Sequence, residues 1–359
     1  MRGFLVISKK YDATLINAWI SCILNRSPKK FHIRTYFELS FSALTSHYLF
    51  NHTYDFEELI LEMCFCVIKV PSCIIYFTNL KVLKLCGIIF NIDASPRIHL
   101  PVLKKFDTKN CSWLNAHDDV TIDAPLLESV LMEQDRNSVF CNPHSCKIKF
   151  SASCIKEFTY CGSGGISQPI VLSNSSAARN ASVNIILDKD GCGSYVQETE
   201  YCAFILLKQF REVKCIKFDA SEVLTQPNVA ILPKFTMLSH LELGCVSGVV
   251  LLGLLQKSSV LNTLLFKVPR LSKFNQELLN SAVVPDCLTS TLQVVKFENV
   301  YGTKHELFLA KYFMENGMVL ERMSFSCVSW CNKDLIEEFK EKLYSFKNGV
   351  SFAILEFRY

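Results

Sequence analysis

Large apolar residues recur along the chain with a step of three positions followed by a step of two. In the stretch FTMLSHLELGCV, for example, Leu238 is followed by Leu241 and then by Leu243. A step of three keeps side chains on one face of a helix, whereas a step of two keeps them on one face of a strand. The combination therefore indicates an apolar turn residue followed by the two inward-facing residues of a short strand.

This arrangement returns along most of the chain, and successive copies begin 23 to 31 residues apart. A unit of this length headed by L-x-x-L-x-L is typical of leucine-rich repeats. One or two matches would arise by chance in any leucine-rich α/β enzyme, but a series at nearly regular intervals favours a repeat protein. The apolar residues of the copies are Phe56/Leu59/Leu61, Leu80/Leu83/Leu85, Leu103/Phe106, Leu127/Val130/Met132, Ile155/Phe158/Tyr160, Val213/Ile216/Phe218, Leu238/Leu241/Leu243, Leu261/Leu264/Phe266, Leu292/Val295/Phe297 and Leu320/Met323/Phe325, with weaker copies at Phe31/Ile33 and Ile185/Leu187.

The repeat predicts an α/β fold, a leucine-rich-repeat solenoid. Each unit contributes a short strand and then returns along the convex side to begin the next parallel strand. Two apolar stretches, Thr199–Val213 and Val249–Ser259, predict return helices, because each is long enough for a helix and leads directly into a repeat strand. We therefore expect a curved parallel sheet with helices or loops on its convex side.

Composition and charge narrow the classes of partner. Half of the 359 residues are hydrophobic, and 38 basic and 34 acidic side chains leave a net charge of only +4, without a long basic run. This balance disfavours nucleic acid as a partner. The longest apolar run, Val246–Leu255, is too short to cross a bilayer, and the apolar core at Phe4–Ile7 is too short for a signal peptide. We expect a soluble protein of the cytoplasm or nucleus that has no membrane partner.

The 17 cysteines do not predict a disulfide framework or a metal site. Without a secretory signal they are expected to be reduced thiols that pack as small apolar residues. The strongest metal candidate is CNPHSC, Cys141–Cys146, but it lacks a second ligand pair at zinc-binding spacing and is interpreted as a loop between repeats. Six cysteines are expected directly after repeat strands, under the turns: Cys64, Cys86, Cys111, Cys161, Cys245 and Cys327.

The remaining polar motifs do not assemble a catalytic site. The glycine-rich stretch CGSGGIS, Cys161–Ser167, lacks the Gly-Lys-Ser/Thr ending of a phosphate-binding loop, and its Ser163 does not lie in a G-x-S-x-G elbow. The eight histidines show no H-x-x-H pairing and are not near a nucleophile motif. We therefore predict no catalytic residue, no metal and no cofactor.

Residues toward the C-terminus carry the motif of a known family. Val284-Pro-Asp-Cys-Leu288 leads into a repeat strand, Gly302 lies in the following loop, and a helix is expected over Glu306–Asn316, with Ala310-Lys-Tyr312 inside it. Val319-Leu320 and Met323 then begin the next strand. This order of motifs resembles the FBD region of plant F-box/leucine-rich-repeat proteins. Thr14–Ile33 likewise resembles the segment that follows the F-box in that family.

The resemblance divides the chain into three parts. Residues 1–34 form a helix and a first strand, residues 35–280 form irregular leucine-rich repeats, and residues 281–359 form the FBD region and a C-terminal cap. Within the last part Gly317 is expected as the left-handed residue that ends a helix. A second helix over Lys333–Leu343 and a closing strand in GVSFAILEF are expected to follow.

An F-box pattern is not recognisable before Trp19, and we expect that this sequence does not include one. In the family the F-box docks on a Skp-type adaptor of an SCF ubiquitin ligase, so that partner is implied only if an F-box lies upstream. The repeat array of the family presents its concave sheet to a target protein. The resemblance therefore implies target recognition within an SCF-type ligase.

The face that would bind a target consists of outward-pointing strand residues, which alternate with the buried ones. Two other hypotheses remain open. The chain is a stand-alone interaction protein, or a truncated relative, without a role in ubiquitin transfer, or it is an α/β enzyme. A pull-down with a Skp-type adaptor separates the SCF-type function from the stand-alone one. The outward residues predicted to contact the partner are Lys84, Asp107, Lys217, His240, Glu242, Lys296 and Ser324.

Overall fold

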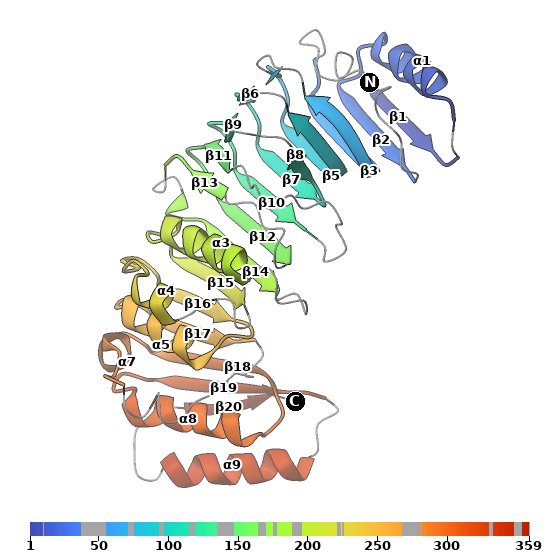
Figure 1. Cartoon of the computed structure of the whole chain (residues 1–359). Coiled ribbons are helices and arrows are strands. Elements are labelled where there is room, and N and C mark those ends of the chain that lie inside the picture. The colour runs from blue at the N-terminus through green and yellow to red at the C-terminus, as the bar shows by residue number, and fades with distance from the viewer. Residues whose placement is uncertain are drawn as a thin grey trace. The chain divides into compact units, whose positions relative to one another are not determined.

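The computed structural model divides the chain into two compact units (Figure 1). The first unit comprises Met1–Ala178 and Cys192–Gln209, and the second comprises Arg179–Gly191 and Phe210–Tyr359. The residues that the structure describes are 1–9, 11–36, 55–70, 75–92, 97–114, 119–134, 147–163, 170–174, 178–188, 196–220, 224, 226–267, 279, 282–329, 333–347 and 354–358.

The main sheet of the first unit is parallel and follows the order of the chain. Its inward residues are those of the repeat, such as Leu59 and Leu61, which are almost completely buried, so the predicted strands are confirmed. A helix, α1 (Ala13–Leu24), connects the first two strands, and β8 (Ser112–Leu114) pairs with the far half of β5. The strands are β1 (Arg2–Ile7), β2 (Lys30–Thr35), β3 (Glu58–Val70), β5 (Val82–Ile92), β7 (Lys105–Lys109), β10 (Ser129–Glu133) and β12 (Glu157–Ser163).

A second parallel sheet lies along one side of the first unit, a feature that the sequence did not predict (Figure 1). Its strands are only two to four residues long and carry no leucine signature, so they lie hidden within the returns of the repeat. The core fills the space between the two sheets, where the rings of Phe106 and Phe150 are 5.3 Å apart. In order across this sheet, the strands are β13 (Ile170–Leu172), β11 (Ile148–Ser151), β9 (Val120–Asp123), β6 (Arg97–His99) and β4 (Ile75–Tyr76).

A helix at the end of the first unit, α3 (Val196–Gln209), confirms one of the two predicted return helices. It packs against β13, where the side chain of Gln209 replaces a neighbouring strand. Gln209 Nε2 donates a hydrogen bond to the carbonyl of Ile170 at 2.6 Å, and its Oε1 accepts one from the amide of Leu172. This exchange satisfies backbone groups of β13 that a further strand would otherwise pair.

The second unit consists of parallel strands in chain order with helices in their returns (Figure 1). The predicted return helix is confirmed as α5 (Gly248–Lys257), and the helices predicted in the C-terminal region are confirmed as α8 (Lys304–Asn316) and α9 (Lys333–Lys347). Two short helices are α4 (Gln226–Ala230) and α7 (Asp286–Ser290). The strands are β14 (Ser182–Asp188), β15 (Cys215–Ala220), β16 (His240–Leu243), β17 (Thr263–Phe266), β18 (Val294–Val300), β19 (Arg322–Cys327) and β20 (Ile354–Arg358).

Two details of the second unit differ from expectation. In the pairing of β14 with β15, Val183 lies opposite Ile216 and Ile185 opposite Phe218, so the repeat pair is Val183/Ile185 and not Ile185/Leu187. Apolar residues alternate along all of β14, and only the neighbouring strand determines which of them form the pair. Gly317 ends α8 as predicted but has a negative φ of −85°. It must be glycine because a Cβ there would lie 2.6 Å from the carbonyl oxygen of Phe313.

The cysteines occupy two kinds of position. Cys111 and Cys245 follow their strands as expected, whereas Cys64, Cys86 and Cys161 lie inside strands that run further than the repeat pair. The thiol of Cys111 is buried, and this burial raises its pKa to about 12. The cysteines that the structure describes are free thiols: Cys22, Cys64, Cys66, Cys86, Cys111, Cys154, Cys161, Cys202, Cys215, Cys245, Cys287 and Cys327.

An irregular β-bulge in β3 allows β3 and β5 to continue beyond the repeat pair. Three residues of β3, Met63–Phe65, stand opposite Gly87 alone, and the regular register resumes where Cys66 meets Ile88. Gly87 has a φ of +65°, and a Cβ at this position would clash with the carbonyl oxygen of Met63. Glycine is therefore required by both the backbone conformation and the close approach of the neighbouring strand.

The C-terminal strands share an aromatic stack. Each of β17, β18, β19 and β20 places one phenylalanine at the same inward position, and neighbouring rings are stacked with centroids 5.1, 5.1 and 5.0 Å apart. We call this set the phenylalanine ladder; it consists of Phe266, Phe297, Phe325 and Phe357.

The helix over the ladder begins with a capping box. Thr303 Oγ1 accepts a hydrogen bond from the amide of Glu306 at 3.3 Å, and Glu306 Oε2 accepts one from the amide of Thr303 at 2.7 Å. Burial raises the pKa of the Glu306 carboxyl. These bonds fix the start of α8 so that Phe313 reaches Phe266, with ring centroids 5.8 Å apart.

Candidate protein-binding face

The outward residues of the parallel strands form rows, because every strand pairs with its neighbour in the same register. We call the row between the two inward repeat residues the central row. In the first unit it consists of Phe4, His32, Ile60, Lys84, Asp107, Leu131 and Thr159. In the second unit it consists of Asn184, Lys217, Glu242, Leu265, Lys296, Ser324 and Glu356.

Six of the seven residues predicted from the sequence lie in a central row. The structure brings Lys84 beside Asp107 in the first unit. In the second unit it brings Lys217 beside Glu242, and Lys296 beside Ser324. Strand pairing therefore joins residues that are 23 to 28 positions apart in the sequence into continuous surfaces.

Two of the carboxylates in these rows, those of Asp107 and Glu242, are already paired with lysines. Lys84 and Lys105 place their Nζ atoms 3.7 and 3.5 Å from Asp107 Oδ2. Lys217 Nζ lies 2.8 Å from Glu242 Oε2, and this hydrogen bond raises the pKa of Lys217. The Asp107 and Glu242 side chains are each only 14% exposed, whereas Lys84 and Lys217 are each 43% exposed. A partner would therefore meet the ammonium groups before the carboxylates.

Ser324 is on the predicted face but offers little surface, because only 7% of it is exposed. Its neighbours across the strands, Lys296 and Glu356, carry longer side chains on the same face. The alternation of the strand correctly predicts the direction of Ser324. It does not predict how much the neighbouring side chains cover it.

His240 lies on the same face as Glu242, one outward position earlier on β16. It is half-buried, and this burial lowers the pKa of its imidazole. The charge of Glu242 opposes the effect, whereas Lys296 and Lys217 add to it. His240 is therefore neutral at pH 7, and the part of the imidazole that reaches the surface can take part in a neutral hydrogen bond.

The lowered pKa of His240 predicts a pH dependence of stability. Below about pH 6.5 the unfolded chain binds a proton at this histidine more readily than the folded chain does, so the free energy of unfolding decreases as the pH falls. We expect His240→Asn to lose less stability than the wild type between about pH 7.5 and about pH 5.5, as measured by urea denaturation. Equal losses in the two proteins would contradict the assignment.

Further ion pairs cross the same face of the first unit and were not predicted. Lys30 Nζ lies 2.7 Å from Glu58 Oε2, and Lys109 Nζ lies 3.0 Å from Glu133 Oε1. Arg34 donates a hydrogen bond to Glu62, which lowers the pKa of that carboxyl. The sequence contained the signal, since these residues occupy the outward positions on either side of the central row.

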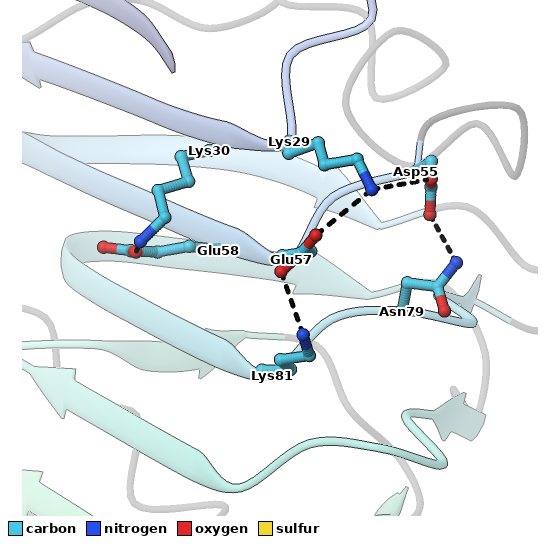
Figure 2. Close-up of polar contacts among 7 residues, drawn as sticks. All are labelled: Lys29, Lys30, Asp55, Glu57, Glu58, Asn79 and Lys81. Atoms are coloured by element: carbon cyan, nitrogen blue, oxygen red, sulfur yellow. Dashed lines mark hydrogen bonds and ion pairs between the residues drawn. The ribbon is translucent and has the colours of Figure 1, made fainter. Parts of the chain in front are cut away.

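A charged column precedes the strands of the first unit. Its members come directly before their strands, and each backbone N–H donates to the carbonyl of the member before it, at 2.7 to 2.9 Å. Figure 2 shows the first part of the column, where Glu57 lies between Lys29 and Lys81. We call this column the amino-edge ladder; it consists of Lys29, Glu57, Lys81, Lys104, Glu128 and Lys156.

The sequence carries a simple signal for this ladder. In the five repeats from Phe56 to Tyr160, the residue that follows the first apolar position is always Lys or Glu. Only the pairing of the strands shows that these residues are neighbours. The ladder residues were not predicted from the sequence, because they come before the strands and therefore lie outside the alternation of inward and outward strand residues.

One polar cluster tests the enzyme hypothesis directly. On the outer face of the second sheet, Tyr76, His99, Asp123 and Ser151 stand side by side on successive strands. His99 Nδ1 lies 2.6 Å from Asp123 Oδ2, and the Tyr76 ring stacks on the imidazole at 4.9 Å. Asp123 thus separates the imidazole from the Ser151 hydroxyl, so these residues do not form a nucleophile–base pair.

In the described part of the chain, no three His, Cys, Asp or Glu side chains gather closely enough to hold a metal ion. The CNPHSC motif, Cys141–Cys146, lies outside the described residues. Within the same ranges, the helices are all too short or too polar to cross a membrane.

Comparison with known proteins finds a matching family model and several similar plant proteins. The profile of the FBD family matches residues 280–325. An F-box/FBD/LRR-repeat protein of Arabidopsis thaliana is 25% identical over 99% of this chain and 77% of its own length. An FBD-associated F-box protein of the same plant is 31% identical over 31% of this chain and 26% of its own length.

A further F-box/FBD/LRR-repeat protein of Arabidopsis thaliana is 36% identical over 29% of this chain and 24% of its own length. No solved structure matches the chain. The parallel repeat sheet, the position of the FBD match and the length of the first alignment agree with one another. The chain therefore carries an FBD domain and is homologous to the plant F-box/FBD/LRR-repeat proteins.

Proposed function

We propose that the chain is a protein-binding module that uses the central rows to hold a target protein, like the substrate-recognition part of an SCF-type ubiquitin ligase. The observation that carries the proposal is the alignment of outward side chains into continuous rows on neighbouring parallel strands. A repeat sheet of this kind offers a long surface for a folded partner or an extended one. Homology to F-box/FBD/LRR-repeat proteins, a family of generally non-catalytic adaptors, supports the same reading.

The central row of the second unit has the chemistry of a protein interface. Leu265 lies between Glu242 and Lys296, so a half-buried apolar residue is flanked by charged ones. Interfaces between proteins commonly combine an apolar centre with a polar rim. The ion pair of Lys217 with Glu242 keeps both side chains in place before a partner arrives.

The proposal is tested by reversing charge in this row. We expect Lys217→Glu combined with Lys296→Glu to abolish capture of proteins that the wild-type chain enriches from plant extract, as measured by quantitative mass spectrometry. The matched control is Lys304→Glu combined with Lys333→Glu, which makes the same charge change at the first residues of α8 and α9, where acidic side chains are favourable. A captured set that survives the row variant would contradict the proposal.

A second candidate function is a stand-alone interaction protein, or a truncated relative, that has no role in ubiquitin transfer. The relatives named above carry F-box in their names, and the ligase role requires such a segment. Co-precipitation of the complete natural gene product with a Skp-type adaptor decides between the two. Stable binding to the adaptor would rule out the stand-alone function, whereas its absence, with target capture intact, would rule out the ligase role.

A further inference from the structure

The amino-edge ladder of the first unit contains two Lys–Glu–Lys triads. In the first triad, Glu57 lies 3.2 Å from Lys29 and 2.9 Å from Lys81 (Figure 2). In the second triad, Glu128 lies 3.8 Å from Lys104 and 2.9 Å from Lys156. Each triad shares one carboxylate between two ammonium groups. In the first triad Lys29 Nζ also lies 3.9 Å from Asp55 Oδ2, so only the second triad carries a net charge of +1.

The carboxylates of both triads are ionised at neutral pH. Hydrogen bonds from Lys81 and Lys29 lower the pKa of Glu57, and a hydrogen bond from Lys156 lowers the pKa of Glu128. All of these side chains are accessible to water, so the pairs hold the charges in place without removing them from solvent. The positive charge that remains on the second triad, whose Lys104 is next to Lys81, is available to a ligand.

The two triads meet at Lys81 and Lys104. The amide of Lys104 donates a hydrogen bond to the carbonyl of Lys81 at 2.9 Å, so the two residues are direct neighbours just before β5 and β7. Strands of one sheet are about 4.8 Å apart, and in this column no carboxylate stands between the two lysines. Elsewhere in the ladder every lysine faces a glutamate. The ammonium groups of these two lysines lie near glutamates on opposite sides, Glu57 and Glu128, and an anion placed between the lysines would be attracted by both.

Two more lysines extend this positive site. Lys84 on β5 and Lys105 on β7 share the single carboxylate of Asp107, which is largely covered. The turn that leads to Glu128 also carries an exposed apolar residue, since Leu126 is 46% exposed. This edge of the sheet therefore offers both ammonium groups and an exposed apolar side chain.

We propose that an acidic segment of a protein partner binds at this site, with Asp or Glu carboxylates between Lys81 and Lys104 and an apolar side chain against Leu126. This proposal rests on the proposed function and names the chemistry of the partner. The flanking carboxylates of Glu57 and Glu128 lie one strand away on each side, so the site favours a short acidic segment over a long phosphate backbone. The match is one of charge complementarity, which confers specificity and rapid association.

The experiment uses the full chain and a phage-displayed library of random peptides. The test variant is Lys81→Gln combined with Lys104→Gln. Its fold should be unaffected, because Glu57 keeps Lys29 and Glu128 keeps Lys156 as partners. The matched control is Lys29→Gln combined with Lys30→Gln, which removes the same charge from the same edge of the sheet but leaves the adjacent lysines intact.

We expect the wild type and the control to enrich peptides rich in Asp and Glu that contain an apolar residue. A synthetic peptide from that set should bind the test variant about tenfold or more weakly, and its affinity for the wild type should fall as salt increases. Enriched peptides that are not acidic, or that bind the test variant as well as the control, would overturn this proposal. Equal binding of a single-stranded RNA, lost in the same variant, would overturn it as well.

The outcomes separate this proposal from the broader one. If peptides are enriched and are lost with Lys217→Glu combined with Lys296→Glu but not with Lys81→Gln combined with Lys104→Gln, then the acidic-segment site is wrong and the binding function stands. If none of the proteins enriches any peptide, and extract capture also fails, the binding function itself is wrong. Thermal unfolding of each variant shows whether a lost signal reflects lost folding.

Discussion

Removal of residues 285–359 is expected to leave a chain that aggregates instead of a shorter folded repeat protein. β17 would become an edge strand, and the inward side chains of Leu264 and Phe266, now completely buried, would lose their cover. Phe266 would lose its stacking partner Phe297 and its contact with Phe313. Repeat arrays with an exposed apolar end tend to aggregate, so their terminal repeats must present a polar outer face.

Light scattering and size-exclusion chromatography of the purified truncated chain would measure this effect. Co-expression of residues 280–359 as a separate chain provides the control, because it supplies the missing cover and should partly restore solubility. A truncated protein that stays monomeric and unfolds cooperatively would show that the FBD region is not needed as a cap. The FBD region would then have to be explained by binding alone.

Phe297→Ala is expected to lower the free energy of unfolding by about 3–5 kcal/mol, as is usual for a buried phenylalanine. Phe297 is 1% exposed and stands between Phe266 and Phe325 in the phenylalanine ladder. Its removal opens a cavity and breaks two ring contacts. Because the neighbouring backbones are held by strand pairing, the site cannot collapse to fill the space.

Urea denaturation followed by circular dichroism measures this loss. Phe297→Leu should cost less than the alanine variant, because most of the volume is retained. Phe4→Ala is the matched control: Phe4 is likewise a phenylalanine in a strand, but it points outward and is 59% exposed, so its loss should cost about 0.5 kcal/mol or less. A cost for Phe297→Ala that is no larger than that of Phe4→Ala would show that the ladder does not stabilise the fold.

The arrangement of charge on the first unit bears on how a partner is selected. Several lysines there are paired with glutamates across neighbouring strands, as in Lys30 with Glu58 and Lys109 with Glu133. Exposed pairs of this kind contribute little to stability, because water screens them. They do fix the positions of the charges, so a departure from alternation, as at Lys81 and Lys104, becomes a local feature that a partner can recognise.

The local pattern of apolar residues was enough to predict which residues face the core. Each repeat has apolar residues equivalent to Leu241 and Leu243. A strand that is buried on one face needs apolar residues at every second position, and this requirement is local. For the same reason the pattern predicted the directions of Lys217, Glu242 and Lys296. The return helices α3 and α5 were predictable because each is an apolar run long enough to form a helix.

Which of these residues become neighbours depends on how the strands pair in the folded chain. The second sheet consists of strands too short to leave a periodic signal, and β14 has several apolar residues that could have formed its repeat pair. The amino-edge ladder brings together residues 23 to 28 positions apart in the sequence. Local sequence determines the direction of a side chain, but the register between strands determines its neighbours, and register depends on the pairing of the whole sheet.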